Sequence, residues 1–157
     1  MRVAVLTLSD TRAAGKAEDT AGGAIREMVW AAGGTIVSYE VIPDERGEIE
    51  SRLASLADSG EADIILTTGG TGLGPRDVTP EATLAVAERE VPGLTEAIRA
   101  RSLEKAPTSM LSRAVAAQRG KAIIVNLPGS ERAARECLDV ILGVLPHAVE
   151  MMAGKGH

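Results

Sequence analysis

Short apolar runs alternate regularly along this chain with segments of helical periodicity, and this pattern leaves few folds open to it. Runs with the length and composition of buried strands lie at residues 3–8, 35–42, 64–66 and 121–126. Between them, apolar residues recur three and four positions apart, as they do at Ala21, Ala24, Ile25, Met28, Val29 and Ala32. This alternation predicts an α/β fold: a three-layer αβα sandwich with a largely parallel sheet.

Some local features are less decided. Residues 112–117 could pair antiparallel with the strand at 121–126 through a turn at Arg119-Gly120, and a helix fits this stretch nearly as well. Thr79-Pro80 is expected to begin a helix with Thr79 as its N-cap, because Pro is tolerated in the first helical turn. Pro146 is expected to interrupt or kink the last helix.

The chain has the size and composition of one domain. Its 157 residues are 45% hydrophobic and contain no linker, repeat or low-complexity tract, so we expect a single domain over residues 1–157. No apolar run approaches the ~20 residues of a membrane span, and the first residues lack signal-peptide anatomy. A cytoplasmic protein is therefore expected. The lone Cys137 cannot form an intramolecular disulfide.

Charge and aromatic content exclude several functions. The net charge is −5 and aromatic residues make up 1% of the chain. An acidic chain with only one Trp, one Tyr and no Phe is a poor binder of nucleic acid or of anionic membranes. If the protein handles phosphate, it must use backbone N–H groups, a few placed Arg or Lys residues, or a metal ion.

Polar sequence follows each expected parallel strand at its carboxyl end, where open α/β sheets bind ligands. These segments are Ser9-Asp10, Asp44-Glu45, residues 68–77 and residues 126–130. The segment at 67–77 contains Gly69, Gly70, Gly72 and Gly74, which permit positive φ and let N–H groups face an anion. It matches neither the Walker nor the Rossmann pattern. It can be an anion-binding loop ahead of a helix N-terminus, or only a tight strand-to-helix connection.

Asp44 and Asp77 are the acids of interest, because both follow an expected strand or loop. A pair of carboxylates at one crevice suits Mg²⁺, which binds one or two carboxylates together with substrate phosphates. Either residue can instead cap a helix. Asp10 is a weaker third candidate. Single arginines near the loops could meet phosphate or remain solvated, namely Arg12, Arg76 and Arg113. The two histidines, His147 and His157, lie far from the expected crevice.

Five stretches together resemble one known family. The first two are Thr67-Thr68-Gly69-Gly70-Thr71-Gly72 and, after a short gap, Arg76-Asp77-Val78-Thr79-Pro80-Glu81-Ala82. The others are Leu8-Ser9-Asp10, Ile42-Pro43-Asp44-Glu45, and Leu111-Ser112-Arg113 followed by Asn126-Leu127-Pro128-Gly129-Ser130. In order and spacing they resemble the molybdenum-cofactor biosynthesis family typified by MogA and MoaB, over nearly the whole chain.

The resemblance implies a reaction and a set of roles. The reaction is adenylyl transfer from Mg²⁺-bound ATP to the terminal phosphate of molybdopterin, with release of pyrophosphate. Asp44 and Asp77 match the family carboxylates associated with catalysis and metal or nucleotide handling. The positions that match the phosphate and nucleotide site are Gly69, Gly70, Thr71, Gly72, Pro128 and Gly129. Those assigned to the molybdopterin site are Ser9, Asp10, Ser102, Ser112 and Asn126.

The resemblance also implies partners. Members of the family are commonly trimers, some are hexamers, and a molybdenum insertase is a candidate partner. Two alternatives remain beside the enzyme. One is a non-catalytic molybdopterin-binding or scaffold homologue of the same pathway, and the other is a nucleotide-binding α/β domain of another pathway. Both Asp44 and the run from Arg76 to Pro80 are of the catalytically active type.

Overall fold

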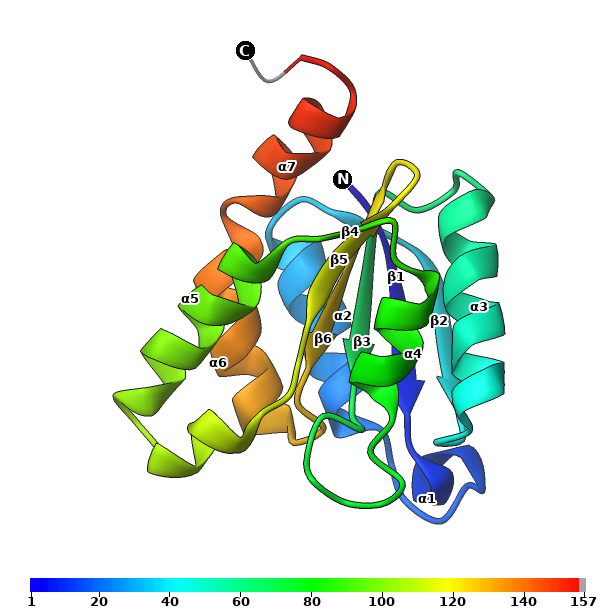
Figure 1. Cartoon of the computed structure of the whole chain (residues 1–157), viewed down its shortest axis with the longest axis vertical. Helices are drawn as coiled ribbons and strands as arrows, with labels where there is room; N and C mark the ends of the chain where they lie inside the picture. The colour runs from blue at the N-terminus through cyan, green and yellow to red at the C-terminus, as the bar shows by residue number, and fades with distance from the viewer. Residues whose placement is uncertain (156–157) are drawn as a thin grey trace.

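The computed structural model describes residues 1–155 and has a six-stranded sheet at its centre, in the order β2-β1-β3-β6-β5-β4 (Figure 1). The strands are β1 (Arg2–Leu8), β2 (Thr35–Ile42), β3 (Ile64–Thr68), β4 (Arg89–Glu90), β5 (Ala116–Arg119) and β6 (Ala122–Leu127). Strands β2, β1, β3 and β6 are parallel to their neighbours. Strand β5 runs antiparallel to β6, and β4 antiparallel to β5. The prediction of a largely parallel sheet is confirmed.

Helices cover both faces of the sheet. They are α1 (Asp10–Ala13), α2 (Thr20–Ala31), α3 (Arg46–Asp58), α4 (Thr79–Val86), α5 (Pro92–Leu103), α6 (Glu131–Leu142) and α7 (Leu145–Met152), with the 3₁₀ helix η1 (Pro107–Leu111). In Figure 1, α2, α5 and α6 lie on one side of the sheet and α3 and α4 on the other, so the three layers are plain. The expected interruption at Pro146 is the start of a separate helix, α7.

The two faces of the sheet carry separate hydrophobic cores, as side-chain alternation along strands requires. In β1, Val3 and Val5 join the core under α2 and α6, whereas Ala4 and Leu6 join the core under α3. All six residues from Val3 to Leu8 are buried. A strand buried on both faces is the expected product of a continuous apolar run in a parallel sheet.

The ambiguous stretch before β6 divides into two elements. Residues 107–111 form η1, and Ala116–Arg119 form β5, which pairs antiparallel with β6. Gly120 turns the chain between them with a φ of +55°. The strand interpretation is therefore the right one, although β5 begins four residues later than the 112–117 stretch suggested.

The helix at Thr79 begins in a way that the sequence did not predict. Val78 occupies the N-cap position of α4, without a side-chain hydrogen bond, and Thr79 is the first helical residue. The Thr79 hydroxyl donates to the carbonyl of Gly69 at 2.9 Å. The expected N-cap role of Thr79 is wrong, because its hydroxyl serves a loop carbonyl instead of the helix end.

The fold brings four chain segments to one edge of the sheet. Since β2, β1, β3 and β6 are parallel, their carboxyl ends meet there, followed by residues 43–45, 9–19, 69–78 and 128–130. In Figure 1 this is the lower edge, where the loop after β3 hangs between α1 and the α5–η1 connection. Across residues 1–155, no helix has the length and apolar character needed to cross a membrane.

Candidate functional site

A glycine-rich loop, residues 69–78, forms the centre of the site. Its first residue is tied to β6 by a bond from the Gly69 N–H to the Leu127 carbonyl at 3.0 Å. Gly69 and Gly70 have φ values of +106° and +65°, and a Cβ at Gly69 would collide with the carbonyl of Leu8. A Cβ at Gly70 would collide with the Thr79 hydroxyl and lie 3.3 Å from an Asp44 oxygen. The loop can press this closely against β1 and Asp44 only because these residues are glycine.

Thr79, the first residue of α4, holds the beginning of the loop in place. It is fully buried, its N–H donates to the Gly70 carbonyl at 3.1 Å, and its hydroxyl donates to the Gly69 carbonyl. Two consecutive loop carbonyls are thereby turned toward α4. The first turn of α4 then lies immediately behind the loop, which is the arrangement in which helix N-termini favour anions.

An acid cluster borders the loop on the side of α1 and α3. The N–H of Asp10 donates to the Asp44 carboxylate and the N–H of Asp44 to the Asp10 carboxylate, each at 3.0 Å. Arg76, from the loop, donates to Asp10 at 2.9 and 3.0 Å and to Glu45 at 2.8 Å. We call Asp10, Asp44, Glu45 and Asp77 the acid cluster. Arg76 is thus paired with two acids, although about half of its side chain (53%) remains exposed to solvent.

Asp77 belongs to the loop itself. Its carboxylate accepts from the Gly74 N–H at 2.9 Å, and a Cβ at Gly72 would lie 2.8 Å from the same oxygen. The helices that follow Asp44 and Asp77 are capped by Glu45 and Val78, neither with a side-chain bond. The capping interpretation therefore fails for both acids, and their carboxylates face the loop.

The surroundings of Asp44 disfavour its charge. Burial raises its pKa above the usual value, and the neighbouring carboxylates of Asp10 and Asp77 raise it further, whereas the Asp10 N–H and Arg76 oppose the rise. A half-buried carboxylate beside two others is a group that a bound cation would stabilise. Within residues 1–155, no three or more His, Cys, Asp or Glu side chains are grouped so that they could hold a metal ion.

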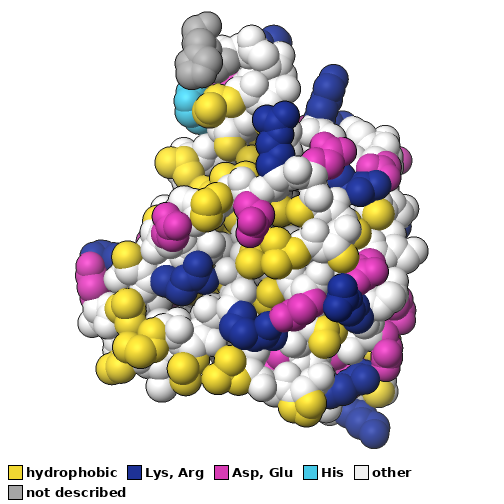
Figure 2. All heavy atoms as spheres, in the orientation of Figure 1, with side chains coloured by type: hydrophobic (Ala, Val, Ile, Leu, Met, Phe, Trp, Pro, Cys, Tyr) yellow, Lys and Arg dark blue, Asp and Glu magenta, His cyan; other side chains and the backbone are white. Residues whose placement is uncertain are grey.

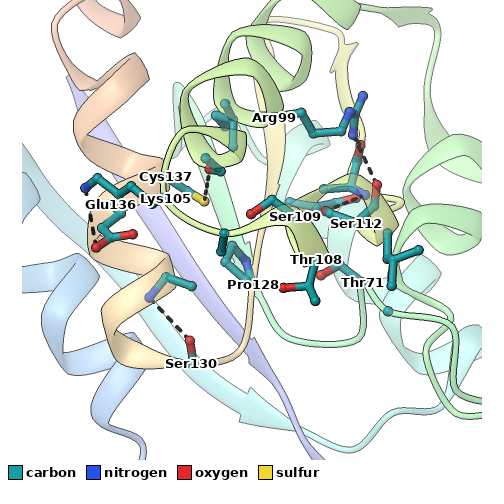
Figure 3. Close-up of a pocket in the computed structure, with 18 of the residues that line it drawn as sticks. Thr71, Arg99, Lys105, Thr108, Ser109, Ser112, Pro128, Ser130, Glu136 and Cys137 are labelled. Atoms are coloured by element: carbon teal, nitrogen blue, oxygen red, sulfur yellow. Dashed lines mark hydrogen bonds and ion pairs between the residues drawn. The ribbon is translucent and has the colours of Figure 1, made fainter.

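A cavity of about 650 Å³ borders the loop on the side of α5, η1 and α6. Figure 3 shows side chains from these elements converging on it, with Arg99 and Ser112 on one side and Lys105 and Glu136 on the other. Its polar lining consists of Thr71, Arg99, Ser102, Lys105, Thr108, Ser109, Ser112, Asn126, Ser130, Arg132 and Glu136. Its apolar lining includes Leu73, Leu111 and Cys137. The volume is in the range of sites that hold small organic ligands.

Three basic side chains give the cavity a positive component. Lys105 lies 3.4 Å from Glu136, and Arg132 lies 3.2 Å from the same carboxylate, so one acid is shared by two cations. Arg99 donates to the carbonyls of Ala114 at 2.9 Å and Ser112 at 3.5 Å. A phosphate group entering the cavity would therefore meet cations and hydroxyl groups.

The predicted site residues divide between the two sides of the loop. Those that line the cavity are Thr71, Gly72, Ser102, Ser112, Asn126 and Pro128. Ser9 and Asp10, which the resemblance assigned to molybdopterin, lie instead beside Asp44, since Ser9 precedes the Asp10–Asp44 pair and caps α1. Gly129 packs on Gly69: a Cβ there would lie 3.3 Å from the Gly69 Cα.

Asn126 lines the cavity but uses its amide inside the fold. Its side-chain N–H groups donate to the hydroxyls of Thr67 at 3.0 Å and Thr83 at 2.9 Å. Its side-chain oxygen accepts from the Val115 N–H at 3.2 Å. The residue is 1% exposed. This pattern joins β3, α4 and the start of β5, so the amide orients the walls of the cavity.

Sequence reasoning missed several lining residues, chiefly Arg99, Lys105, Thr108, Ser109 and Ser130. A signal for two of them existed. Arg99 lies three residues before Ser102 and shares its face of α5, and Lys105 follows just after that helix ends at Leu103. Of the other basic candidates, Arg12 donates to the carbonyls of Glu18 and Gly129, each at 3.3 Å. His147 pairs with Glu150 on α7, and His157 is outside the described residues.

Exposed apolar side chains lie in the cavity lining, as Leu73 and Leu111 do, or next to it in η1, as Met110 does. Leu73, Met110 and Leu111 are at least half exposed, at 67%, 63% and 52%. Figure 2 shows hydrophobic side chains gathered at the lower left of that view, the region that Figure 1 assigns to the α5–η1 connection. Trp30 and Tyr39, the one tryptophan and one tyrosine, belong to α2 and β2 and do not line the cavity.

The architecture and the site place the chain in a recognisable class. It is an α/β protein with an open, mostly parallel sheet, whose carboxyl edge presents a backbone-rich loop between carboxylates and a partly basic cavity. That combination suits a phosphorylated small molecule. The family model described as "Probable molybdopterin binding domain" matches residues 4–147, and the chain belongs to this family.

Individual relatives agree with the family. A molybdopterin adenylyltransferase of Helicobacter pylori (strain J99) is 39% identical over 156 residues, covering 98% of this chain and 89% of that protein. The molybdopterin adenylyltransferase of Escherichia coli K12 is 38% identical over 168 residues, with coverage of 98% and 86%. The crystal structure of the molybdopterin biosynthesis enzyme MoaB from Thermus thermophilus is 49% identical, covers 98% of this chain and 97% of its own, and superposes with a TM-score of 0.91.

Proposed function

We propose that this protein is a molybdopterin adenylyltransferase that transfers AMP from ATP to the terminal phosphate of molybdopterin. Relatives of that name match nearly the whole chain at 38–39% identity. One structural observation carries the proposal. A single glycine-rich loop borders both the acid cluster and a cavity of about 650 Å³, so two phosphorylated substrates can meet across it.

The proposed step needs little acid–base chemistry. An oxygen of the molybdopterin phosphate attacks the α-phosphorus of ATP, the bond from that phosphorus to the β-bridging oxygen breaks, and pyrophosphate leaves with the electron pair. The attacking phosphate is already ionised near neutral pH, so no residue has to remove a proton from it. Catalysis then depends on positioning and charge stabilisation, which backbone N–H groups and cations supply.

We assign the substrates to opposite sides of the loop. The ATP phosphates lie along Gly69, Gly70, Thr71 and Gly72, ahead of the α4 N-terminus, with Ser9, Asp10 and Gly129 at the same side. Molybdopterin occupies the cavity, against Ser102 and Ser112, and its phosphate meets the basic side chains of Arg99 and Lys105. Pro128, which the family resemblance places in the nucleotide site, lines the same cavity. Asn126 holds the cavity walls through the bonds described above.

The residues present fit Mg²⁺. A triphosphate beside the acid cluster would be repelled by it unless a cation lay between them, and burial and the neighbouring acids disfavour the charge of Asp44 there. Asp44 and Asp77 would hold the ion, with substrate phosphates supplying further ligands. When bound, the ion neutralises phosphate charge that develops during transfer.

The test is pyrophosphate release from ATP and Mg²⁺, with and without molybdopterin. We expect molybdopterin-dependent release in the wild type and its loss in Asp44→Ala and Asp77→Ala, with molybdopterin binding retained. Asp139→Ala serves as the control, because Asp139 is an exposed acid on α6 away from the loop. If the protein binds molybdopterin but releases no pyrophosphate, the proposed enzymatic function is overturned and the non-catalytic scaffold is favoured. Full release in both Asp variants would overturn the site assignment.

Other features of the proposal rest on the sequence and the family resemblance. They are the action of residues 1–157 as one molybdopterin-binding domain, a trimeric or hexameric assembly, a molybdenum insertase as a partner, and a cytoplasmic location.

A further inference from the structure

Arg113 contacts the glycine-rich loop at three points. It lies between η1 and β5, and its backbone N–H donates to the Thr71 carbonyl at 3.0 Å. Its Nε donates to the Gly72 carbonyl at 2.7 Å, and its Nη2 to the Asp77 carbonyl at 2.6 Å. Its Nη1 donates to the carboxylate of Glu81. Each of the three guanidinium nitrogens therefore donates to the loop or to the helix behind it.

The rest of the loop is held by other groups. Thr79 binds the carbonyls of Gly69 and Gly70, and Gly74 and Asp77 close a turn on each other at 2.9 and 3.0 Å. Residues 71–73 lie between these two fixed points. In the part of the chain that the structure describes, the hydrogen bonds that join residues 71–73 to the remainder all come from Arg113.

The segment that carries Arg113 is also a wall of the cavity. Ser112 and Ala114, its neighbours, line the cavity, and the Arg99 guanidinium on α5 binds the carbonyls of both. Thr71 and Gly72, whose carbonyls accept hydrogen bonds from Arg113, line the same cavity. Arg113 thus joins the wall of the cavity to the loop, and through the Asp77 carbonyl to the acid cluster on the other side.

Glu81 sets the direction of the guanidinium. It lies in the first turn of α4, where the helix dipole favours a carboxylate. The Arg113 guanidinium lowers the pKa of Glu81, so the pair stays charged near neutral pH. Arg113 is a third exposed and Glu81 somewhat more, at 33% and 38%. A planar fork reaching three oxygens in different directions is a task that lysine cannot reproduce.

We propose that Arg113 is a positioning residue for the transfer step, which sets residues 71–73 and Asp77 in register with the cavity wall so that the two phosphates align. The inference rests on the proposed function. It predicts that loss of the fork affects the chemical step more than the binding of either substrate alone, because each half of the site survives and only their alignment is lost.

The test compares Arg113→Lys with a matched control, Arg119→Lys. Arg119 also spreads its guanidinium over a carboxylate and a carbonyl, namely Asp58 at 2.8 and 2.9 Å and Val86 at 3.0 Å. It lies at the β5–β6 turn, at the edge of the sheet opposite the loop. We expect kcat to fall about 100-fold in Arg113→Lys, with little change in KM for ATP or molybdopterin. Arg119→Lys should keep the wild-type kcat.

Amide hydrogen exchange supplies a readout that does not depend on activity. In Arg113→Lys we expect faster exchange at residues 69–78 and unchanged exchange in β1, β3 and β6, whereas Arg119→Lys should leave the loop unchanged. Glu81→Gln, which keeps the shape of the side chain but removes its charge, should give a smaller change of the same kind. It keeps the inference testable if Arg113→Lys does not fold.

The outcomes separate the two proposals. The inference would be overturned if amide exchange at residues 69–78 were the same in Arg113→Lys as in Arg119→Lys. It would also be overturned if the wild type were active and the two variants had the same kcat. A lower affinity for ATP with unchanged kcat would also overturn it, because that is the result expected of a binding residue. If the wild type releases no pyrophosphate, the proposed function fails, and the exchange data alone decide whether Arg113 positions the loop.

Discussion

Asp10 and Asp44 form a reciprocal pair of hydrogen bonds: the backbone N–H of each donates to the carboxylate of the other, at 3.0 Å in both directions. The pair joins the loop after β1 to the loop after β2, at the edge where the site is built. Each carboxylate gains a donor, yet two negative charges are brought together. Within the pair the electrostatic cost falls on Asp44, whose pKa is raised, whereas Arg76 and the Asp44 N–H lower the pKa of Asp10.

The raised pKa of Asp44 predicts the effect of Asp44→Asn on stability. The folded-state pKa of Asp44 is raised by burial and by the carboxylates of Asp10 and Asp77, so its charged form disfavours the folded state. A raised carboxyl pKa stabilises the fold below the pKa of the unfolded chain, and this contribution is lost as pH rises through the folded-state pKa. At pH 7, Asp44→Asn should therefore have a higher Tm than the wild type while turnover falls about 100-fold.

Calorimetry between pH 3 and pH 8 checks this prediction. The difference in Tm should shrink as pH falls and the wild-type carboxyl becomes protonated. A lower Tm for Asp44→Asn at pH 7 would contradict it, and would mean that the hydrogen bond from the Asp10 N–H outweighs the repulsion.

Gly72→Ala tests how closely the loop approaches Asp77. The new Cβ would lie 2.8 Å from an Asp77 oxygen, which is closer than real contacts allow, so the carboxylate or the loop must move. We expect a folded protein whose kcat falls about tenfold or more, because small displacements of positioning groups are costly to rate. Gly47→Ala, at a helical site with no atom near the added Cβ, is the control. Steady-state kinetics with equal rates for both variants would contradict the prediction.

Tyr39 reports on a buried carboxylate next to the site. Its hydroxyl donates to Asp19 at 2.7 Å, and the Thr7 hydroxyl and the Gly22 N–H donate to the same carboxylate at 2.6 and 2.9 Å. Burial, followed by the bond to Asp19, raises the pKa of Tyr39 to about 12. Because the chain has a single tyrosine, absorbance at alkaline pH titrates this group alone. The transition should occur well above pH 10 in the native protein.

Removing that hydroxyl should cost stability. Tyr39→Phe leaves the ring under Arg26 but removes one donor to Asp19, which should lower the free energy of unfolding by about 1–3 kcal/mol. The contribution holds below the unfolded tyrosine pKa and is lost as pH rises toward 12. Urea denaturation at pH 7 measures it, and an unchanged midpoint would show that the bond contributes nothing.

Asn126→Ala distinguishes a wall residue from a ligand-binding residue. The substitution leaves the Val115 N–H and the hydroxyls of Thr67 and Thr83 without their partner in a buried position. We expect a loss of about 3 kcal/mol in the free energy of unfolding. Ser102→Ala, on the exposed side of the same cavity, should lower molybdopterin affinity at unchanged stability. Equal stability of Asn126→Ala and the wild type would contradict the assignment.

The elements, and the edge that carries the site, could be predicted from the amino-acid order alone. Strand and helix periods are local, so the apolar run at 3–8 and the helical spacing from Ala21 to Ala32 predicted β1 and α2. The glycines at 69–74 and the acids at 44 and 77 follow strands, and parallel strands bring such segments together whatever their order. The resemblance to the MogA and MoaB family rested on the same segments, and family membership is confirmed.

Only the tertiary structure shows which of the site residues contact one another. The strand order β2-β1-β3-β6-β5-β4 joins Asp10 to Asp44, and it brings Arg113 against Gly72, forty-one positions earlier in the chain. It also turned Asn126 inward and assembled the cavity from α5, η1 and α6. The physical reason is that periodicity encodes which face of an element is apolar, whereas strand order and side-chain pairing are set by packing between elements distant in sequence.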